Sequence, residues 1–170
     1  MKKIIIGSLA LALIYACGDS SKTTTTETTT TETTTTESTP AEAPQTMEFT
    51  VNATGNTMAD MDYDTKEIKV KAGSTVKINL TNQGTDAAMV HNIVIVKPGT
   101  EKEVATEGIS LKDKNYFNPE NANVIAGSAV AAPGATVTVE FTAPSEAGTY
   151  PYICTYPGHW MKMTGVLIVE

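Results

Sequence analysis

The chain has 170 residues, which is enough for one ordinary domain. Its formal net charge is −7 at pH 7, from 12 Lys and Arg against 19 Asp and Glu. Proteins that bind nucleic acid need a basic face to neutralise phosphates, so this balance argues against a nucleic-acid partner. Only two Cys and two His occur. Two Cys exclude both a multi-disulfide scaffold and a four-cysteine zinc site.

Residues 1–16 predict an export signal. Lys2 and Lys3 form a positive end, and an apolar run of 13 residues follows at positions 4–16. A membrane-spanning helix needs about 20 apolar residues, so this run fits a cleavable signal peptide better than a membrane span.

The signal ends in Ile14-Tyr15-Ala16-Cys17, which resembles the lipobox of bacterial lipoproteins. That resemblance implies that the signal is removed and that Cys17 is lipidated. The protein would then sit in the cell envelope, lipid-anchored to a membrane and facing the periplasm or the cell exterior. The alternative is an ordinary signal peptide that happens to be followed by a cysteine.

Residues 17–46 predict the lipidated cysteine and a disordered linker. Positions 23–37 are three copies of the sequence TTTTE, and no hydrophobic periodicity accompanies them. Such a segment cannot bury enough apolar surface to offset the entropy lost on ordering, so we expect a spacer between membrane and domain.

Residues 47–170 predict one all-β domain. Several short segments alternate apolar and polar residues with a period of two, which is typical of strands with one buried face. These segments are 48–53, 68–70, 76–80, 137–141 and 166–168. The denser apolar run 90–96 predicts a strand that is covered on both faces. Turn-forming sequences such as Pro98-Gly99 separate the segments, and together they favour a β-sandwich or barrel.

One stretch, residues 100–123, interrupts the strand pattern. Positions 100–111 have the composition of a short helix, and positions 115–123 are rich in turn-forming residues. We expect this excursion to cover an edge of the sandwich.

The chemistry is concentrated near the C-terminus, where Cys154, His159 and Met163 follow one another with the spacing Cys-x4-His-x3-Met. The other histidine, His91, lies in the apolar run upstream. Two His nitrogens, one Cys sulfur and a weak Met sulfur are typical of an electron-transferring copper site. Zinc prefers a closed set of stronger donors, although it can occupy such a site. If Cys17 carries lipid, metal binding also accounts for the unpaired Cys154 in an exported protein.

The whole segment 47–170 resembles the cupredoxins, and among them the azurins and auracyanins. The loop from Cys154 to Met163, CTYPGHWMKM, matches the azurin loop in length and order. The pair His91-Asn92 matches the His-Asn pair of that family, and the sequence NYFNP at 115–119 resembles the azurin approach to its last hairpin.

This resemblance implies a Greek-key β-sandwich that holds one type 1 copper ion, cycling between Cu(I) and Cu(II). His91, Cys154 and His159 would be the equatorial ligands and Met163 the weak axial ligand. The backbone carbonyl of Val90 would be a further weak ligand, because azurins use a glycine carbonyl there.

Other residues have implied supporting roles. Asn92 and Thr155 would tie the two ligand segments together by hydrogen bonds. An apolar patch would receive redox partners where the loop histidine reaches the surface. Its candidate members are Trp160, Tyr156, Pro157, Met61 and Met89.

The predicted function is a blue copper electron carrier, not an enzyme. It would shuttle single electrons between partners such as cytochromes or other envelope oxidoreductases. One alternative is a copper-binding protein for storage, delivery or resistance, although such proteins usually contain more Met and His than this chain. A second alternative is a metal-free β-sandwich interaction module.

Overall fold

The structure is a computed structural model that describes residues 46–170. The predicted export signal, most of the linker and Cys17 lie outside the described residues. Within residues 46–170, no helix combines the length and the hydrophobicity needed to cross a membrane.

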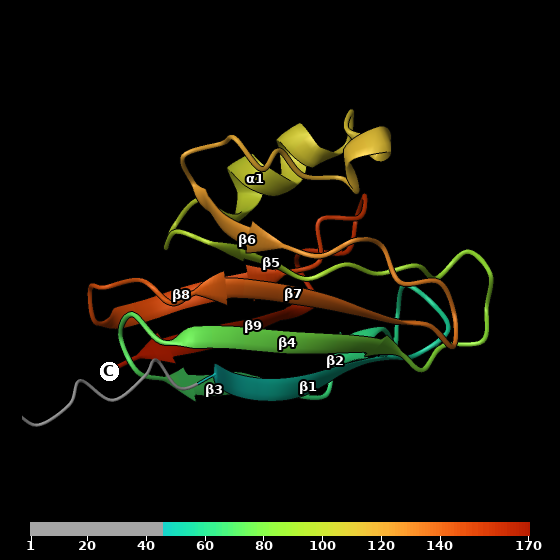
Figure 1. Cartoon of the computed structure of the whole chain (residues 1–170). Coiled ribbons are helices and arrows are strands. Elements are labelled where there is room, and N and C mark those ends of the chain that lie inside the picture. The colour runs from blue at the N-terminus through green and yellow to red at the C-terminus, as the bar shows by residue number, and fades with distance from the viewer. Residues whose placement is uncertain (1–45) are drawn as a thin grey trace, which may run out of the picture. The chain divides into compact units, whose positions relative to one another are not determined.

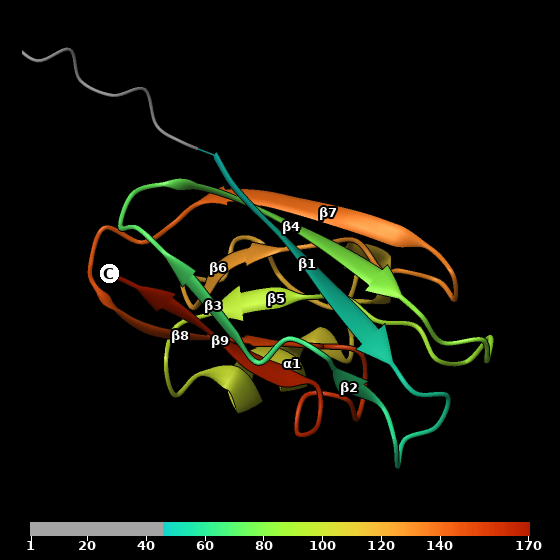
Figure 2. The same cartoon turned by 90° about the horizontal axis from the view of Figure 1, so that it is seen from below.

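The described residues form two β-sheets (Figures 1 and 2). The four-stranded sheet has the order β2-β1-β4-β7, with bounds β1 Thr46–Thr54, β2 Asp62–Tyr63, β4 Thr75–Asn82 and β7 Thr136–Thr142. The five-stranded sheet has the order β3-β9-β8-β5-β6, with bounds β3 Glu67–Val70, β5 Val94–Val96, β6 Val124–Gly127, β8 Gly148–Ile153 and β9 Thr164–Val169. The chain passes repeatedly from one sheet to the other, so β1 pairs with β4, and β3 with β9, in parallel. The predicted all-β sandwich is confirmed.

Apolar side chains at every second strand position fill the space between the two sheets. In β4 every second residue is buried, and Val76, Ile78 and Leu80 are wholly inaccessible to solvent. This period of two is the one read from the sequence, because successive side chains of a strand point to opposite faces. A strand with one apolar face therefore packs against the other sheet.

The strand β5 is covered on both faces. Val94, Ile95 and Val96 are all fully buried. Ile95 belongs to the main core, whereas Val94 and Val96 belong to a second cluster with Val104 and Phe117. The predicted two-sided burial is confirmed, but the strand begins only at Val94. Residues 90–93 lead into it as an extended segment that includes an isolated bridge from His91 to Ala131.

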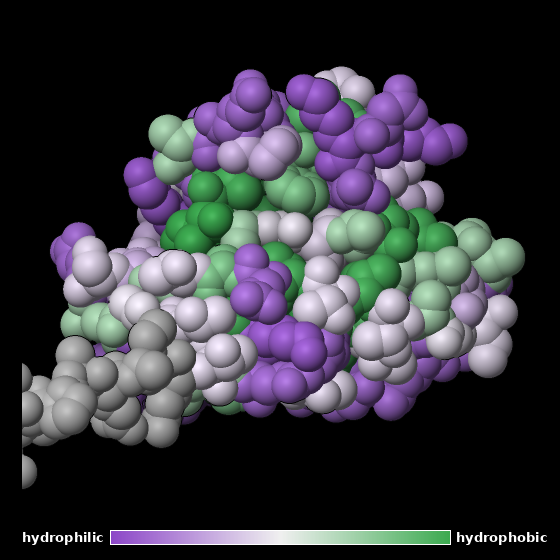
Figure 3. All heavy atoms as spheres, viewed as in Figure 1, coloured by the Kyte–Doolittle hydropathy of each residue, from purple (hydrophilic) through white to green (hydrophobic). Residues whose placement is uncertain are grey.

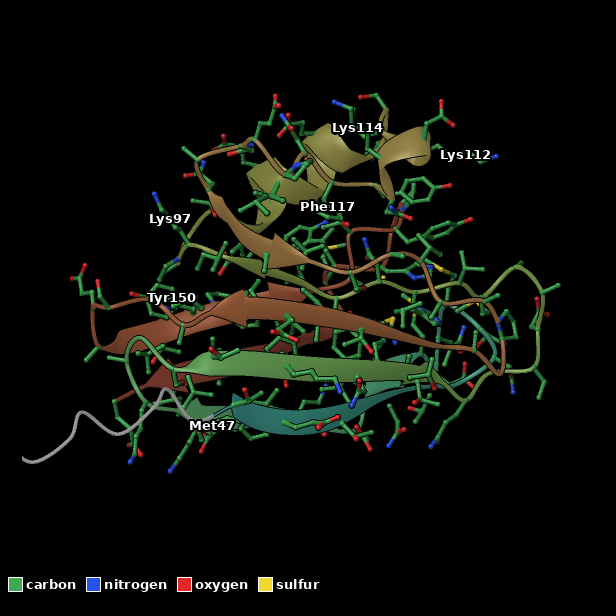
Figure 4. All side chains as sticks on the ribbon, in the orientation of Figure 1. Met47, Lys97, Lys112, Lys114, Phe117 and Tyr150 are labelled. Atoms are coloured by element: carbon green, nitrogen blue, oxygen red, sulfur yellow. The ribbon has the colours of Figure 1, made fainter. Side chains whose placement is uncertain are left out.

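The excursion contains helix α1 (Glu101–Gly108) and the 3₁₀ helix η1 (Lys112–Lys114). It covers the outer face of β5 and β8 rather than a sandwich edge, because Val104 and Ala105 of α1 pack in the second cluster. In Figure 4, the Phe117 side chain lies between the helical part of the excursion and β6, while Lys112 and Lys114 project away from the sheets.

The surface reflects this arrangement. In Figure 3, hydrophilic side chains cover the excursion, and hydrophobic residues form a band beneath it, over β6. An open groove along this band is lined partly by Phe117, Val124, Ile125 and Phe141.

Candidate metal centre

Three potential metal ligands converge at one end of the sandwich. The His91 Nδ1 and His159 Nδ1 atoms are 3.2 Å apart, and Cys154 Sγ lies 4.0 Å from the first and 3.6 Å from the second. A point equidistant from these three atoms is about 2.1 Å from each. That agrees with bonds of about 2.0–2.3 Å that an ion such as Zn²⁺ makes to His nitrogen and Cys sulfur. The donor triangle therefore has the size of a first-row metal site.

Burial keeps both histidine rings in the neutral form that metal binding requires. His91 and Cys154 are completely inaccessible to solvent, and His159 is 1% exposed. Burial lowers the pKa of both histidines to about 4, and repulsion from His159 adds to the effect on His91. Both rings are consequently neutral at pH 7, with lone pairs available for a metal.

The thiol behaves in the opposite sense. Burial raises the pKa of Cys154 to about 11, although hydrogen bonds from the backbone of Asn92 and Tyr156 and from the Tyr63 side chain oppose that shift. Without metal the sulfur is protonated at neutral pH. Metal binding through sulfur must displace this proton.

The C-terminal loop is closed by its own backbone. The Cys154 N–H donates to the Met163 carbonyl at 3.0 Å, and the Met163 N–H donates to the His159 carbonyl at 3.0 Å. Gly158 has φ of 85°, a left-handed conformation that glycine adopts without strain, and this allows the tight turn after Pro157. Cys154 and Met163, nine positions apart, are thus brought together by local geometry.

The loop contains two methionines with different environments. Met163 is completely buried in the core cluster that contains Cys154, whereas Met161 is 70% exposed. Only Met163 is therefore placed on the inner side of the loop, as its spacing predicts.

His91 is held by tertiary contacts instead. Its N–H donates to the Ala131 carbonyl at 3.2 Å, and its carbonyl accepts from the Ala131 N–H at 2.7 Å. The buried side-chain amide of Asn82 donates to the carbonyls of Met89 and Ala131, at 2.8 and 3.1 Å. Asn82 is the last residue of β4, and nothing in its local sequence pattern reveals this anchoring contact.

The side chain of Asn92 joins the two ligand segments. Its Oδ1 accepts from the Thr155 N–H at 2.9 Å, and its Nδ2 donates to Thr155 Oγ1 at 2.8 Å. The same Nδ2 donates to the Asn115 carbonyl at 2.7 Å, which attaches the excursion to the site. Asn115 and Tyr116 both have left-handed backbones, with φ of 57° and 62°. Such strained residues persist where surrounding contacts hold them.

The predicted docking residues lie in three environments. Tyr156 and Pro157 are half-buried residues of the loop itself, and the Tyr156 ring centroid is 4.7 Å from that of His159. Trp160 is also half-buried but packs against the second core cluster. Met61 and Met89 are only 2% and 5% exposed, so they support the site from the core.

Other residues near the loop were not singled out by the sequence. Met58 is 50% exposed, and its methyl group lies so near Gly158 that a Cβ there would be 3.0 Å away. The Tyr116 ring centroid is 4.9 Å from that of Tyr156, in an edge-on arrangement. Val90 is half-buried directly before His91, and the role of its carbonyl remains a prediction.

The fold and the ligand group within residues 46–170 together define a cupredoxin with a metal centre. Residues 48–170 match the family described as copper binding proteins, plastocyanin/azurin family. The chain belongs to this family.

Individual relatives agree with this assignment. The chain is 40% identical to auracyanin-A of Chloroflexus aurantiacus over 119 residues, which are 68% of this chain and 72% of that protein. It is 33% identical to azurin of Pseudomonas fluorescens biotype B over 116 residues, 65% of this chain and 91% of that protein. It is 35% identical to outer membrane protein H.8 of Neisseria meningitidis serogroup B over 118 residues, 66% of this chain and 64% of that protein.

The fold is shared as well. A solved structure of auracyanin A, described as a "blue" copper protein, superposes with a TM-score of 0.65 and 37% identity. The match covers 74% of this chain and all of that one. The predicted cupredoxin fold is confirmed, and the arrangement of His91, Cys154, His159 and Met163 is typical of a type 1 copper site.

Proposed function

We propose that this protein carries single electrons through one copper ion in the cell envelope. His91, Cys154 and His159 would hold the ion, and Met163 and the Val90 carbonyl would be further, weaker ligands. The observation that carries this proposal is the convergence of two neutral, buried Nδ1 atoms and one buried Sγ. A His₂Cys set with a weak Met is typical of electron-transferring copper.

Copper supplies the one-electron couple, and the protein supplies a rigid set of donors. The Cys154–Met163 backbone contact closes the loop, and the Asn92–Thr155 hydrogen bonds fix it against the His91 segment. Hydrogen-bonded partners of this kind orient ligands and tune a metal site. Because little can move, the donors would keep nearly the same positions in both oxidation states.

Burial of the ligands favours a carrier over an enzyme. The three donor residues are at most 1% exposed. A substrate therefore has no direct path to the metal, whereas an electron can pass through the protein shell. The relatives are cupredoxins, which agrees with this interpretation.

Electron exchange requires brief contact with partners such as cytochromes or other envelope oxidoreductases. The surface nearest the loop includes Tyr156, Pro157 and the exposed Met58 and Met161. Tyr156 packs on His159, so a partner on this surface would be one aromatic ring away from a ligand. Weak redox encounters bury less than about 1,200 Å² in total, which a small patch can provide.

The location rests on the N-terminal sequence. The lipobox-like residues before Cys17 support a lipid anchor, and the Thr-rich segment supports a spacer. The relative named outer membrane protein H.8 is consistent with an envelope protein. Expression of the full chain in a Gram-negative host, followed by membrane fractionation, tests this. The protein should sediment with membranes, and a Cys17→Ser variant should not.

Copper loading tests the proposed function itself. Domain 46–170 mixed with Cu(II) should develop an intense visible charge-transfer band that a reductant bleaches. Cys154→Ala should remove the band completely, because the band arises from sulfur, while circular dichroism shows the same fold. Met161→Leu is the matched control and should keep the band. A colourless wild-type protein, or a Cys154→Ala variant with unchanged colour, would contradict the proposal.

A further inference from the structure

The methionines of residues 46–170 differ sharply in their exposure to solvent. Four of them are buried or half-buried, namely Met47, Met61, Met89 and Met163. Met58 and Met161 are instead 50% and 70% exposed. Core packing therefore does not explain why these two positions carry a thioether.

Met58 lies against the turn that precedes the ligand residue His159. A Cβ on Gly158 would be 3.0 Å from the Met58 methyl carbon, so the end of the side chain contacts this turn. The segment that carries Met58 is itself a fixed turn, because the Asp60 carboxylate accepts from the N–H and the hydroxyl of Thr57, at 2.7 and 2.5 Å. The thioether is therefore held beside the ligand loop.

Met161 is tied to the same region of the surface. It lies two residues after His159, and the ammonium group of the neighbouring Lys162 donates to the carbonyl of Ala59. Ala59 directly follows Met58, so this hydrogen bond joins the two methionine segments. Both exposed thioethers therefore border the ligand loop, on the surface proposed above for redox partners.

Exposure makes these two thioethers accessible to dissolved oxidants. Hydrogen peroxide transfers one oxygen atom to a methionine sulfur, so the thioether becomes a sulfoxide and the peroxide becomes water. The product is polar and disrupts Met-rich interfaces, and methionine sulfoxide reductases convert it back to the thioether at the expense of thiols. Met163 is shielded from this reaction because it is completely buried. Peroxide in solution therefore meets the docking residues before the sulfur of the proposed ligand.

We propose that Met58 and Met161 are sites of reversible sulfoxidation by hydrogen peroxide, and that their sulfoxide forms hinder the docking of redox partners. The effect on docking rests on the proposed electron-carrier function. A partner can cover a thioether at little cost, whereas a sulfoxide oxygen must give up its water without gaining a hydrogen bond in an apolar contact. The modification therefore slows electron exchange while the buried ligands stay unmodified.

Peptide mapping tests the modification sites. The metal-free full-length protein is treated with hydrogen peroxide, and mass spectrometry follows the gain of one oxygen atom at each methionine. Met58 and Met161 should be oxidised at least about tenfold faster than Met61, Met89 and Met163, because the reaction follows exposure. Rates that do not separate the exposed methionines from the buried ones overturn the proposal.

Electron exchange tests the consequence for docking. Stopped-flow mixing of the reduced, copper-loaded protein with oxidised cytochrome c gives a second-order rate constant, for protein with and without earlier peroxide treatment. The rate constant should fall at least about fivefold after treatment and should recover when a methionine sulfoxide reductase is added. The double variant Met58→Leu/Met161→Leu, compared with its own untreated form, should show no fall. An unchanged wild-type rate, or an equal fall in the double variant, overturns the proposal.

Met47 is a control for oxidation away from the loop. It lies near the start of β1, where Figure 4 labels it, and Ala53 of the same strand pairs with Asn82 beside the His91 segment. The six residues from Met47 to Ala53 span about 20 Å, so oxidation of Met47, which the double variant retains, should not affect docking. A wild-type protein that binds no copper contradicts the proposed function instead. The peptide map needs no copper and still decides the modification sites, so the two failures are distinguishable.

Discussion

The two segments that provide the predicted ligands reach the same site by different means. The loop from Cys154 to Met163 contains three of them within ten residues, and its own backbone hydrogen bonds close it. His91 lies 63 residues before Cys154 and is held by Ala131 and Asn82, which belong to other parts of the chain. One half of the site is therefore local, and the other half exists only in the folded sandwich.

This difference predicts which substitutions disturb which half. Changes within the loop should alter the metal centre while the sandwich remains intact. Changes that loosen the His91 segment should reduce stability and the metal site together, because the same contacts serve both.

The largest effect on stability is expected for Asn82→Ala. The buried amide bonds the Met89 and Ala131 carbonyls, and its Oδ1 accepts from the Gly84 N–H at 2.9 Å. Loss of these bonds leaves buried groups unpaired and should lower the free energy of unfolding by about 2–4 kcal/mol. Urea denaturation of the metal-free domain measures this. The neighbouring exposed Gln83→Ala should change stability by less than about 0.5 kcal/mol. Equal effects of the two substitutions would show that Asn82 does not anchor the segment.

A smaller effect is expected where the excursion meets both halves. A Cβ on Gly108 would lie 2.1 Å from the Tyr116 carbonyl oxygen, so Gly108→Ala must displace the backbone at Tyr116, next to the Asn115 carbonyl that accepts from Asn92. Overpacking of this kind costs about 1–3 kcal/mol. Gly148→Ala is the control, because its Cβ meets nothing nearer than 3.6 Å. Thermal unfolding should separate the two variants, and an unchanged Gly108→Ala midpoint contradicts the close contact.

The two histidines should respond alike to pH despite their different supports. Burial lowers the pKa of both from 6.5 to about 4, so the unfolded chain binds more protons between these values. Stability of the metal-free domain should therefore be full above about pH 6.5 and should fall as the pH drops toward 4. Urea midpoints at pH 7.5 and pH 5 test this. The double variant His91→Gln/His159→Gln should lose most of the difference, and a persistent difference would assign it to other groups.

The smallest structural effects are expected inside the loop, where only the metal should report the change. Met163→Leu retains buried volume but removes the axial sulfur, so the copper midpoint should become more positive with little loss of stability. Met161→Leu, at a side chain that is 70% exposed, should leave the midpoint unchanged. If Met161→Leu has the larger effect, the axial assignment is wrong.

The parts that could be read from sequence are those set by local spacing. The period of two predicted β1, β3, β4, β7 and β9, and helix α1 falls inside the segment predicted for it. It did not predict β2, β6 or β8. The Cys-x4-His-x3-Met spacing identified three candidate ligands within one loop of the chain. His91 could be chosen because only one other histidine exists.

The predicted docking patch shows that solvent exposure could not be predicted from the sequence. Met61 and Met89 were predicted to belong to the apolar docking patch on the surface. Both are almost fully buried instead. Trp160 follows His159 directly, but its ring packs on the second core cluster. Neighbours in sequence can point to opposite sides of a turn, so exposure depends on the surrounding elements.

The sequence by itself determined the fold class, the family resemblance and the identity of the candidate ligands, because periodicity, ligand spacing and scarce residue types are local properties. The tertiary structure decided how the ligands are supported. Asn82 contacts carbonyls 7 and 49 positions away, on either side of the His91 segment. Asn92 contacts Asn115, which is 23 positions away, and Tyr63 contacts Asn92, which is 29 positions away. These groups meet only in the folded domain, and no short-range pattern in the sequence records their contacts.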